Sequence, residues 1–305
     1  MLRVSILALS VCVLHAQQED YRLTAQANLV ILDVSVRDPA GRFVSDLKKS
    51  DFRVVENGKP RTISDFSHDD EPVTVGLVID NSGSMRGKRD AVNRAAIAFL
   101  DASNANDEIF ITRFNDSVSR SLPKQILFTD NRTLLMRSLE RGPSQGRTAL
   151  YDGVVESLRL LELGKQTRKS LLLVSDGGDN TSINRLADVI EALRGSFATI
   201  YTIGIYDPED PDRNPGVLRR LAEISGGEAF FPKDLDDIQR ICRQIALDIR
   251  NRYTLAYTPS EADSKALRKI RVEVNSPEHP KLIVHARTSY VFPAVTPVSD
   301  KKVRP

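Results

Sequence analysis

The sequence predicts an α/β protein with a doubly wound, mostly parallel, six-stranded sheet and a smaller all-β domain built from the two flanks of the chain. Three observations support this prediction. Strand-like runs alternate with helical patterns between Val73 and Arg252, and on both sides of that region the hydrophobic period is two. The 305 residues, of which 41% are hydrophobic and 28% are charged, are enough for a large buried core.

The N-terminal flank, residues 17–72, contains the first predicted strands. From Leu29 to Arg37 apolar side chains alternate with a more polar set, as in a strand that has one wetter face. Phe52–Val55 reads as a second strand, and Asn57 and Gly58 follow it closely. An Asn-Gly pair predicts a hairpin because both turn residues need a positive φ.

The central region, residues 73–252, alternates strands with helices. The six predicted strands are Val73–Asp80, Glu108–Phe114, Ser117–Gln125, Leu171–Asp176, Thr199–Ile205 and Glu228–Phe231. The predicted helices are Arg89–Ala102, Arg132–Leu139, Leu150–Leu163, Arg185–Leu193, Val217–Ile224 and Asp234–Arg250. The second and third strands follow one another too closely for a crossover helix, so they should pair antiparallel. The alternation elsewhere predicts parallel strands with helices on both faces of the sheet.

The C-terminal flank, residues 253–292, returns to a period of two. Its predicted strands are Tyr253–Tyr257, Ile270–Val274 and Leu282–Ala286. Neither flank is long enough to form a stable β unit alone, so the two are expected to pair around the inserted α/β domain. The last residues, 293–305, read as a disordered tail.

The first 16 residues predict a secretory signal. Arg3 precedes an apolar run that ends at Leu14, and the small residue Ala16 comes before a polar stretch. The run is too short for a membrane-spanning helix, so cleavage near Ala16 and a secreted or periplasmic location are expected. A lipoprotein signal ending at Cys12 is the weaker alternative, because Val11 is a poor residue before a lipidated cysteine.

Removal of that segment leaves 42 basic and 41 acidic residues, a net charge of +1, and one thiol, Cys242. A lone cysteine cannot form an internal disulfide, and its helical pattern predicts a buried position. A near-zero charge argues against a nucleic-acid-binding protein that relies on bulk positive charge. No later segment approaches the length of a membrane span.

Oxygen-bearing side chains follow two of the predicted strands. The strand that starts at Val73 ends in Asp80, with Ser82 and Ser84 close behind, and Asp176 ends the fourth strand. Thr148 comes just before a helix. In an open α/β sheet ligands bind beyond the carboxyl ends of the strands, so these side chains are expected to meet. Hydroxyl and carboxylate oxygens suit Mg²⁺, with Mn²⁺ or Ca²⁺ as alternatives, and two carboxylates leave the cation able to accept a third.

The pattern Asp80-x-Ser82-x-Ser84, with Thr148 and Asp176, resembles the von Willebrand factor type A (VWFA) family and matches its metal-ion-dependent adhesion site (MIDAS). The resemblance extends over Val73 to Arg252. It implies a Rossmann-like sheet of order 3-2-1-4-5-6 with strand three antiparallel. It also implies a recognition module whose metal is completed by an Asp or Glu of a protein ligand. The flanks resemble an acidobacterial group of exported VWFA-related proteins.

Enzymatic alternatives fit poorly. A phosphate-binding loop would need wider spacing than that between Gly83 and Gly87, and a Ser or Thr where Arg89 stands. A haloacid-type phosphatase would need a second Asp where Ser82 stands. A serine hydrolase would need a Gly two residues before its nucleophile and a partnering His, whereas the histidines after the signal all lie in the flanks.

The sequence thus predicts an exported, non-enzymatic adhesion or binding protein whose Mg²⁺ captures an acidic residue of a protein partner. The alternative is a structural or assembly component of a cell-envelope complex in which the metal only stabilises the fold. A third possibility is an accessory subunit of an enzyme.

Overall fold

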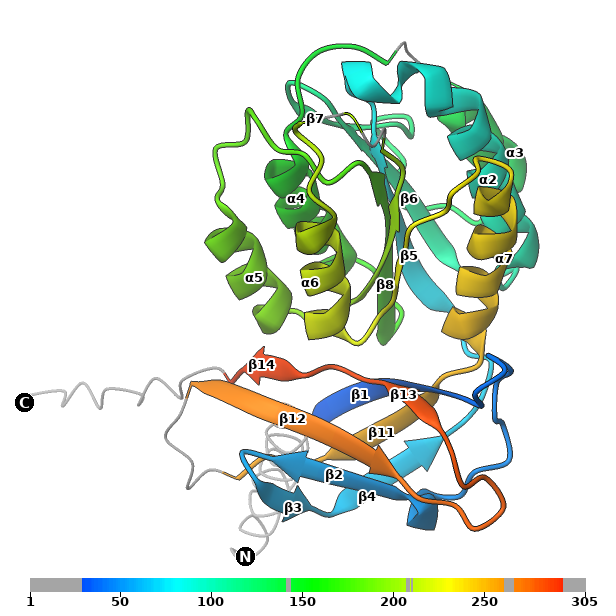
Figure 1. Ribbon diagram of the computed structural model, residues 1–305, viewed down its shortest axis with the longest axis vertical. Coiled ribbons are helices and arrows are strands. Elements are labelled where there is room, and N and C mark those ends of the chain that lie inside the picture. Colours follow the sequence, from blue (N-terminus) through cyan, green and yellow to red (C-terminus); the bar gives the residue numbers. More distant parts are fainter. Residues whose placement is uncertain (1–28, 141–143, 207–208, 210, 261–265, 293–305) are drawn as a thin grey trace, which may run out of the picture.

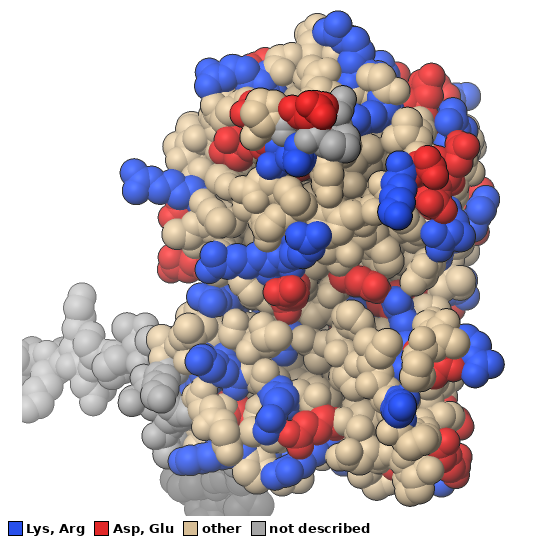
Figure 2. Space-filling view, viewed as in Figure 1, with Lys and Arg blue, Asp and Glu red and all other residues tan. Residues whose placement is uncertain are grey.

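A computed structural model describes residues 29–140, 144–206, 209, 211–260 and 266–292. The predicted signal of residues 1–16, the start of the 17–72 segment and the predicted tail of residues 293–305 lie outside the described residues. One unit contains a sheet with helices on both faces, and a second, all-β unit lies against its lower end (Figure 1). On the face shown in Figure 2, basic and acidic side chains are interspersed and do not gather by sign.

The six-stranded sheet has the order β10-β9-β8-β5-β6-β7. Its strands are β5 (Val73–Asp80), β6 (Glu108–Phe114), β7 (Val118–Arg120), β8 (Arg168–Ser175), β9 (Thr199–Gly204) and β10 (Ala229–Phe230). All neighbours are parallel except β6 and β7, which pair antiparallel. Every residue of β5 is buried, as expected for a central strand that is covered on both faces. The predicted doubly wound topology is confirmed.

Six α-helices cover this sheet, with α4, α5 and α6 on one face and α2, α3 and α7 on the other (Figure 1). They are α2 (Arg89–Ala102), α3 (Arg132–Leu139), α4 (Leu150–Glu162), α5 (Leu186–Gly195), α6 (Pro215–Ser225) and α7 (Asp237–Arg250). Local contacts of the side chain and backbone fix both ends of α6. The side chain of Asn214 caps α6 by accepting from the Val217 backbone N–H at 3.3 Å, and Gly226 ends the helix at a φ of 81°.

The third strand is shorter than predicted. The sequence pattern extends from Ser117 to Gln125, but β7 contains only Val118–Arg120. The N–H of Ser121 still donates to the Ile111 carbonyl at 2.9 Å, and the chain then leaves the ladder before Pro123, which has no N–H to donate. A 3₁₀ segment, η2 (Gly83–Lys88), follows Ser82 and was not predicted.

The flanks form two four-stranded sheets with the orders β13-β1-β11-β4 and β14-β12-β2-β3. Their strands are β1 (Val30–Arg37), β2 (Phe52–Glu56), β3 (Lys59–Arg61), β4 (Ile63–Ser67), β11 (Tyr253–Tyr257), β12 (Leu267–Val274), β13 (Ile283–His285) and β14 (Ser289–Val291). A 3₁₀ turn, η1 (Lys49–Asp51), precedes β2. The expected Asn-Gly hairpin joins β2 to β3. Strands from opposite ends of the chain pair antiparallel, β1 with β11 and β2 with β12, and one hydrophobic cluster contains side chains of both sheets.

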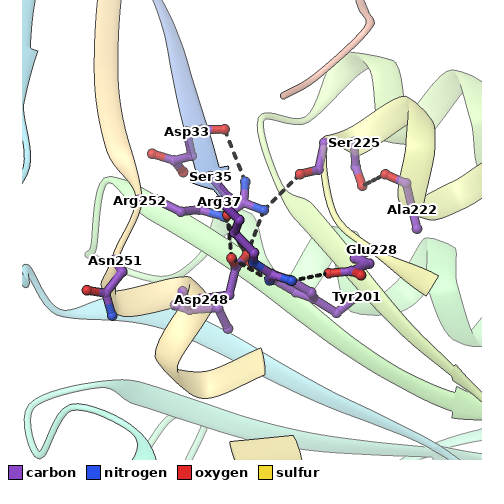
Figure 3. Close-up of polar contacts among 12 residues, drawn as sticks. Asp33, Ser35, Arg37, Tyr201, Ala222, Ser225, Glu228, Asp248, Asn251 and Arg252 are labelled. Atoms are coloured by element: carbon purple, nitrogen blue, oxygen red, sulfur yellow. Dashed lines mark hydrogen bonds and ion pairs between the residues drawn. The ribbon is translucent and has the colours of Figure 1, made fainter. Parts of the chain in front are cut away.

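The second face of β1 is half-buried at Ile31 and Asp33, in keeping with the predicted wetter face, but it is buried at Ser35 and Arg37. Ser35 is fully buried and Arg37 is 5% exposed, because this face contacts the α/β unit. Arg37 lies 2.8 Å from Glu228 and 2.7 Å from Asp248 of α7 (Figure 3). Arg252 lies 3.1 Å from the same Asp248 carboxylate. A buried charge network therefore joins the two units. Among the described residues, no helix is long and apolar enough to cross a membrane.

Candidate metal site

Asp80 is the last residue of the central strand β5 and lies at the carboxyl edge of the sheet. Its side chain is 2% exposed. Its Oδ1 accepts from the Ser82 backbone N–H at 2.9 Å, and its Oδ2 accepts from the Ser175 hydroxyl at 2.7 Å. Burial, together with the neighbouring negative charge of Asp176, raises the pKa of Asp80 to about 6. Removal from water thus makes a free negative charge costly here.

Asp176 directly follows β8, which pairs with β5 in parallel register, Ile79 opposite Val174. This register brings the two acidic strand ends together, as the sequence predicted. Asp176 is 3% exposed, and its Oδ1 accepts from the Gly178 backbone N–H at 2.9 Å. No ion pair joins Asp80 or Asp176 to a lysine or arginine within the part of the chain that the structure describes. Two buried carboxylates therefore lie close together without a cationic side chain.

The two serines form a short hydroxyl chain that ends on Asp176. The hydroxyl oxygens of Ser82 and Ser84 are 3.1 Å apart, and the Ser84 hydroxyl donates to Asp176 Oδ2 at 2.6 Å. Ser82 is 1% exposed, whereas Ser84, in the first turn of η2, is exposed. The hydroxyl chain thus runs from the buried base of the site toward its open side.

Thr148 is brought to the same edge by the loop that precedes α4. Its side chain is 7% exposed. Its backbone N–H donates to Asn180 Oδ1 at 2.9 Å, and its carbonyl accepts from the Asn180 N–H at 3.0 Å. The N–H of Gln145 in turn donates to the Asn81 carbonyl at 2.9 Å. The loop that carries Thr148 is therefore fixed to the segments that follow both acidic strand ends.

Two further residues, which are not among the five predicted ligands, support the site. Ser175 orients the Asp80 carboxylate and also accepts from the Gly177 N–H at 3.0 Å. Asn180 links the Thr148 loop to the loop after Asp176. The available signals were a hydroxyl residue at the last position of a strand and an Asn soon after the strand end, and both are common in ordinary turns.

The donor set fits a hard divalent cation. It contains two carboxylates and three hydroxyls, and such oxygens are the ligands that Mg²⁺ prefers. The hydroxyl chain can reorient its protons, because a serine hydroxyl has lone pairs as well as a donor. A divalent cation would also offset the two buried negative charges that no described basic side chain pairs.

Comparison with known proteins identifies the domain. Residues 75–178 match the family model of the von Willebrand factor type A domain. A protein of Synechocystis sp., described as uncharacterized protein sll0103, is 26% identical over 180 residues, which are 57% of this chain and 41% of that protein. The chain thus spans less than half the length of this relative.

Solved structures show the same fold. A von Willebrand factor type A protein from Catenulispora acidiphila superposes with a TM-score of 0.55 at 14% identity, over 81% of this chain and 75% of that one. Proximal thread matrix protein 1 from the mussel byssus gives a TM-score of 0.50 at 15% identity, over 64% of this chain and 50% of that one. With the matched residues, the sheet order and the superposed structures in agreement, the six-stranded α/β unit of this chain has the von Willebrand factor type A fold.

Proposed function

We propose that this chain is an exported, Mg²⁺-dependent binding protein that captures an acidic residue of a protein partner. Asp80, Ser82, Ser84, Thr148 and Asp176 would hold the ion, some directly and some through water. The observation that supports this function best is the hydroxyl chain from Ser82 through Ser84 to Asp176, beside the buried Asp80 carboxylate. Type A domains are typically interaction modules, which agrees with a binding function and not with catalysis.

Charge balance favours recognition through the metal. The site offers only two carboxylates, and its three hydroxyls carry no charge. The bound ion would therefore keep more electrophilic character than in a site of three or four carboxylates, enough to accept a carboxylate from outside. Ser84 lies on the exposed side of the site, where an incoming ligand could approach. The face of the molecule shown in Figure 2 has no broad field of one sign, so a single bound cation is the more specific recognition element.

A structural role for the metal is the second candidate, and one observation favours it. The site joins three loops, through the Asn81–Gln145 and Thr148–Asn180 backbone contacts. A cation bound there would brace the whole carboxyl edge of the sheet. In an assembly component of a cell-envelope complex, this bracing could be the sole purpose of the site.

A Mg²⁺ titration tests whether the site binds metal at all. We expect calorimetry to show one Mg²⁺ site in the wild-type protein, loss of binding in Asp80→Ala, and unchanged binding in Asp90→Ala. Asp90 is a suitable control because it is an exposed carboxylate in the first turn of α2. Equal Mg²⁺ binding by wild type and Asp80→Ala would overturn the assignment of these residues.

Capture of envelope proteins then separates the two functions. Wild-type protein is incubated with envelope extract in Mg²⁺ or in chelator, and Asp80→Ala is incubated in Mg²⁺. Metal-bridged recognition predicts a partner that is retained only by wild type in Mg²⁺. If Mg²⁺ raises the melting temperature of wild type but capture is the same in all three samples, the structural role is correct and recognition through the metal is wrong.

A further inference from the structure

A groove runs along α4, away from the metal ligands. A hollow of ≈ 390 Å³ lies between α4 and α5, and a second of ≈ 330 Å³ lies between α4 and the strand β7. Val155, Arg159 and Asn184 line both hollows, so the two form one continuous groove. Because β7 is the last strand in the sheet order, this groove lies at an edge of the sheet.

The walls of the groove carry an excess of negative charge above an apolar floor. The floor includes Val118, Val155 and Leu158. The charged lining residues are five carboxylates and two guanidinium groups: Asp152, Glu156, Glu162, Asp188, Glu191, Arg120 and Arg159. Arg159 already lies 3.7 Å from Glu156, and Lys169 lies 3.4 Å from Glu162. Carboxylates still remain in excess, so the groove is complementary to a segment that has basic and apolar side chains.

The loop after Asp176 connects this groove to the metal site. The carboxylate of Asp152 accepts from the backbone N–H of Ile183 at 3.0 Å and of Asn184 at 2.9 Å. These contacts fix the backbone of the loop, while the Ile183 side chain is 93% exposed. A large apolar side chain on a fixed backbone offers contact area to a partner, and little conformational entropy of the loop is lost on binding.

We propose that this groove binds an extended protein segment whose lysine or arginine side chains face its carboxylates and whose apolar side chains cover Ile183 and the floor. The segment would belong to the same partner that supplies the acidic residue to the metal. That last link rests on the proposed function, whereas the preference of the groove for a basic segment does not. The proposed partner would therefore contain an acidic residue that binds the metal, with a stretch of basic and apolar residues before or after it in the partner's sequence.

The test uses a fluorescent, amidated peptide of alternating lysine and valine, with a matched peptide of alternating glutamate and valine. Binding is measured by anisotropy, and the site is located by backbone amide shifts in NMR spectra. The lysine peptide has no carboxylate and cannot occupy the metal. In chelator, where the glutamate peptide cannot bind through the metal, we expect the lysine peptide to bind about tenfold more tightly than the glutamate peptide. The affinity of the lysine peptide should be the same in Mg²⁺ and should fall as salt rises.

Paired variants separate the groove from general surface charge. We expect Glu156→Gln with Glu191→Gln to weaken binding of the lysine peptide about fivefold, since each removes one charge from the groove wall. Glu140→Gln with Glu223→Gln, two exposed sites outside the groove, should leave it unchanged. Equal affinity for the two peptides in chelator, or equal effects of the two variant pairs, would overturn the groove proposal. Because metal binding is measured separately with Asp80→Ala, such a result would leave the proposed function standing.

Discussion

Oδ1 of Asp248 lies 2.7 Å from Nη2 of Arg37, across the boundary between the α/β unit and the flanking sheets (Figure 3). The other carboxylate oxygen lies 3.1 Å from Arg252, and the hydroxyls of Ser35 and Tyr201 also donate to Asp248. Asp248 is 1% exposed. One buried carboxylate thus accepts hydrogen bonds from groups of both units.

Removal of this carboxylate should destabilise the protein strongly. In Asp248→Ala two arginines lose a buried anionic partner, which costs about 3–5 kcal/mol of unfolding free energy. The matched control is Asp237→Ala at the start of the same helix, where the side chain is 43% exposed and the expected loss is below about 1 kcal/mol. Urea unfolding checks both values, and similar losses in the two variants would show that the junction contributes little.

The same contact predicts how stability depends on pH. Burial alone would raise the pKa of Asp248, but Arg252, Arg37 and the donated hydrogen bonds hold it well below its usual value. In the unfolded chain the Asp248 carboxyl has its ordinary pKa of about 3.9. Below that pH the unfolded chain takes up a proton at Asp248 that the folded protein does not. The stabilisation is therefore complete above the unfolded pKa and is lost as the pH falls toward the folded one.

Urea unfolding of wild type and Asp248→Asn at neutral and acidic pH tests this dependence. The difference in unfolding free energy between the two proteins should be largest near neutral pH and should shrink below about pH 4, because only wild type loses the contribution. A difference that stays constant over this range would mean that Asp248 is not ionised in the folded protein.

The contacts of Asp248 could not be predicted from the sequence, whereas other parts of the fold could. The strands of the six-stranded sheet follow a hydrophobic period that predicts them, and the five proposed metal ligands follow a sequence motif. The flank strands β4 and β14 were not predicted. The burial of Ser35 and Arg37 could not be predicted, because Asp248 is 213 and 211 residues away in the chain and nothing in β1 itself signals it. Ser175 was missed for a related reason: its role depends on which strand lies beside β8. The C-terminal end of β7 was predicted too far along the chain. Apolar and polar residues continue to alternate in the sequence after the pairing of β7 with β6 has ended.

Ser175 should control metal affinity without being a ligand. Its hydroxyl donates to Asp80 Oδ2 at 2.7 Å, so Ser175→Ala leaves that buried oxygen without its donor, and only the Ser82 N–H then orients the carboxylate. Loss of such a supporting contact typically lowers metal affinity about 10–100-fold. We expect this loss in calorimetric Mg²⁺ titrations and recovery in Ser175→Thr. Ser170→Ala, at the other end of β8, is the control, and an unchanged affinity in Ser175→Ala would exclude the positioning role.

Gly177 should be intolerant of a side chain. Its φ is +84°, and a Cβ atom there would lie 2.4 Å from the Asn214 carbonyl oxygen. Asn214 also donates its N–H to the Asp176 carbonyl at 3.2 Å, so a shift would disturb a proposed metal ligand. We expect Gly177→Ala to lose about 1–3 kcal/mol of stability and to bind Mg²⁺ more weakly. Gly87→Ala, where a Cβ meets nothing within 4 Å, should do neither. A normal melting temperature for Gly177→Ala would contradict the conformational requirement.

Cys242 should be chemically inert in the folded protein. It is 1% exposed on the buried face of α7, and burial raises its pKa to about 12, so almost none of it is thiolate at neutral pH. Mass spectrometry after treatment with iodoacetamide should find Cys242 unmodified in native conditions and modified in denaturant. Leu247→Cys on the same helix, where the native side chain is 43% exposed, is the positive control and should react without denaturant. Modification of both cysteines at similar native rates would show that α7 opens readily from the sheet, which the buried contacts of Asp248 at its C-terminal end argue against.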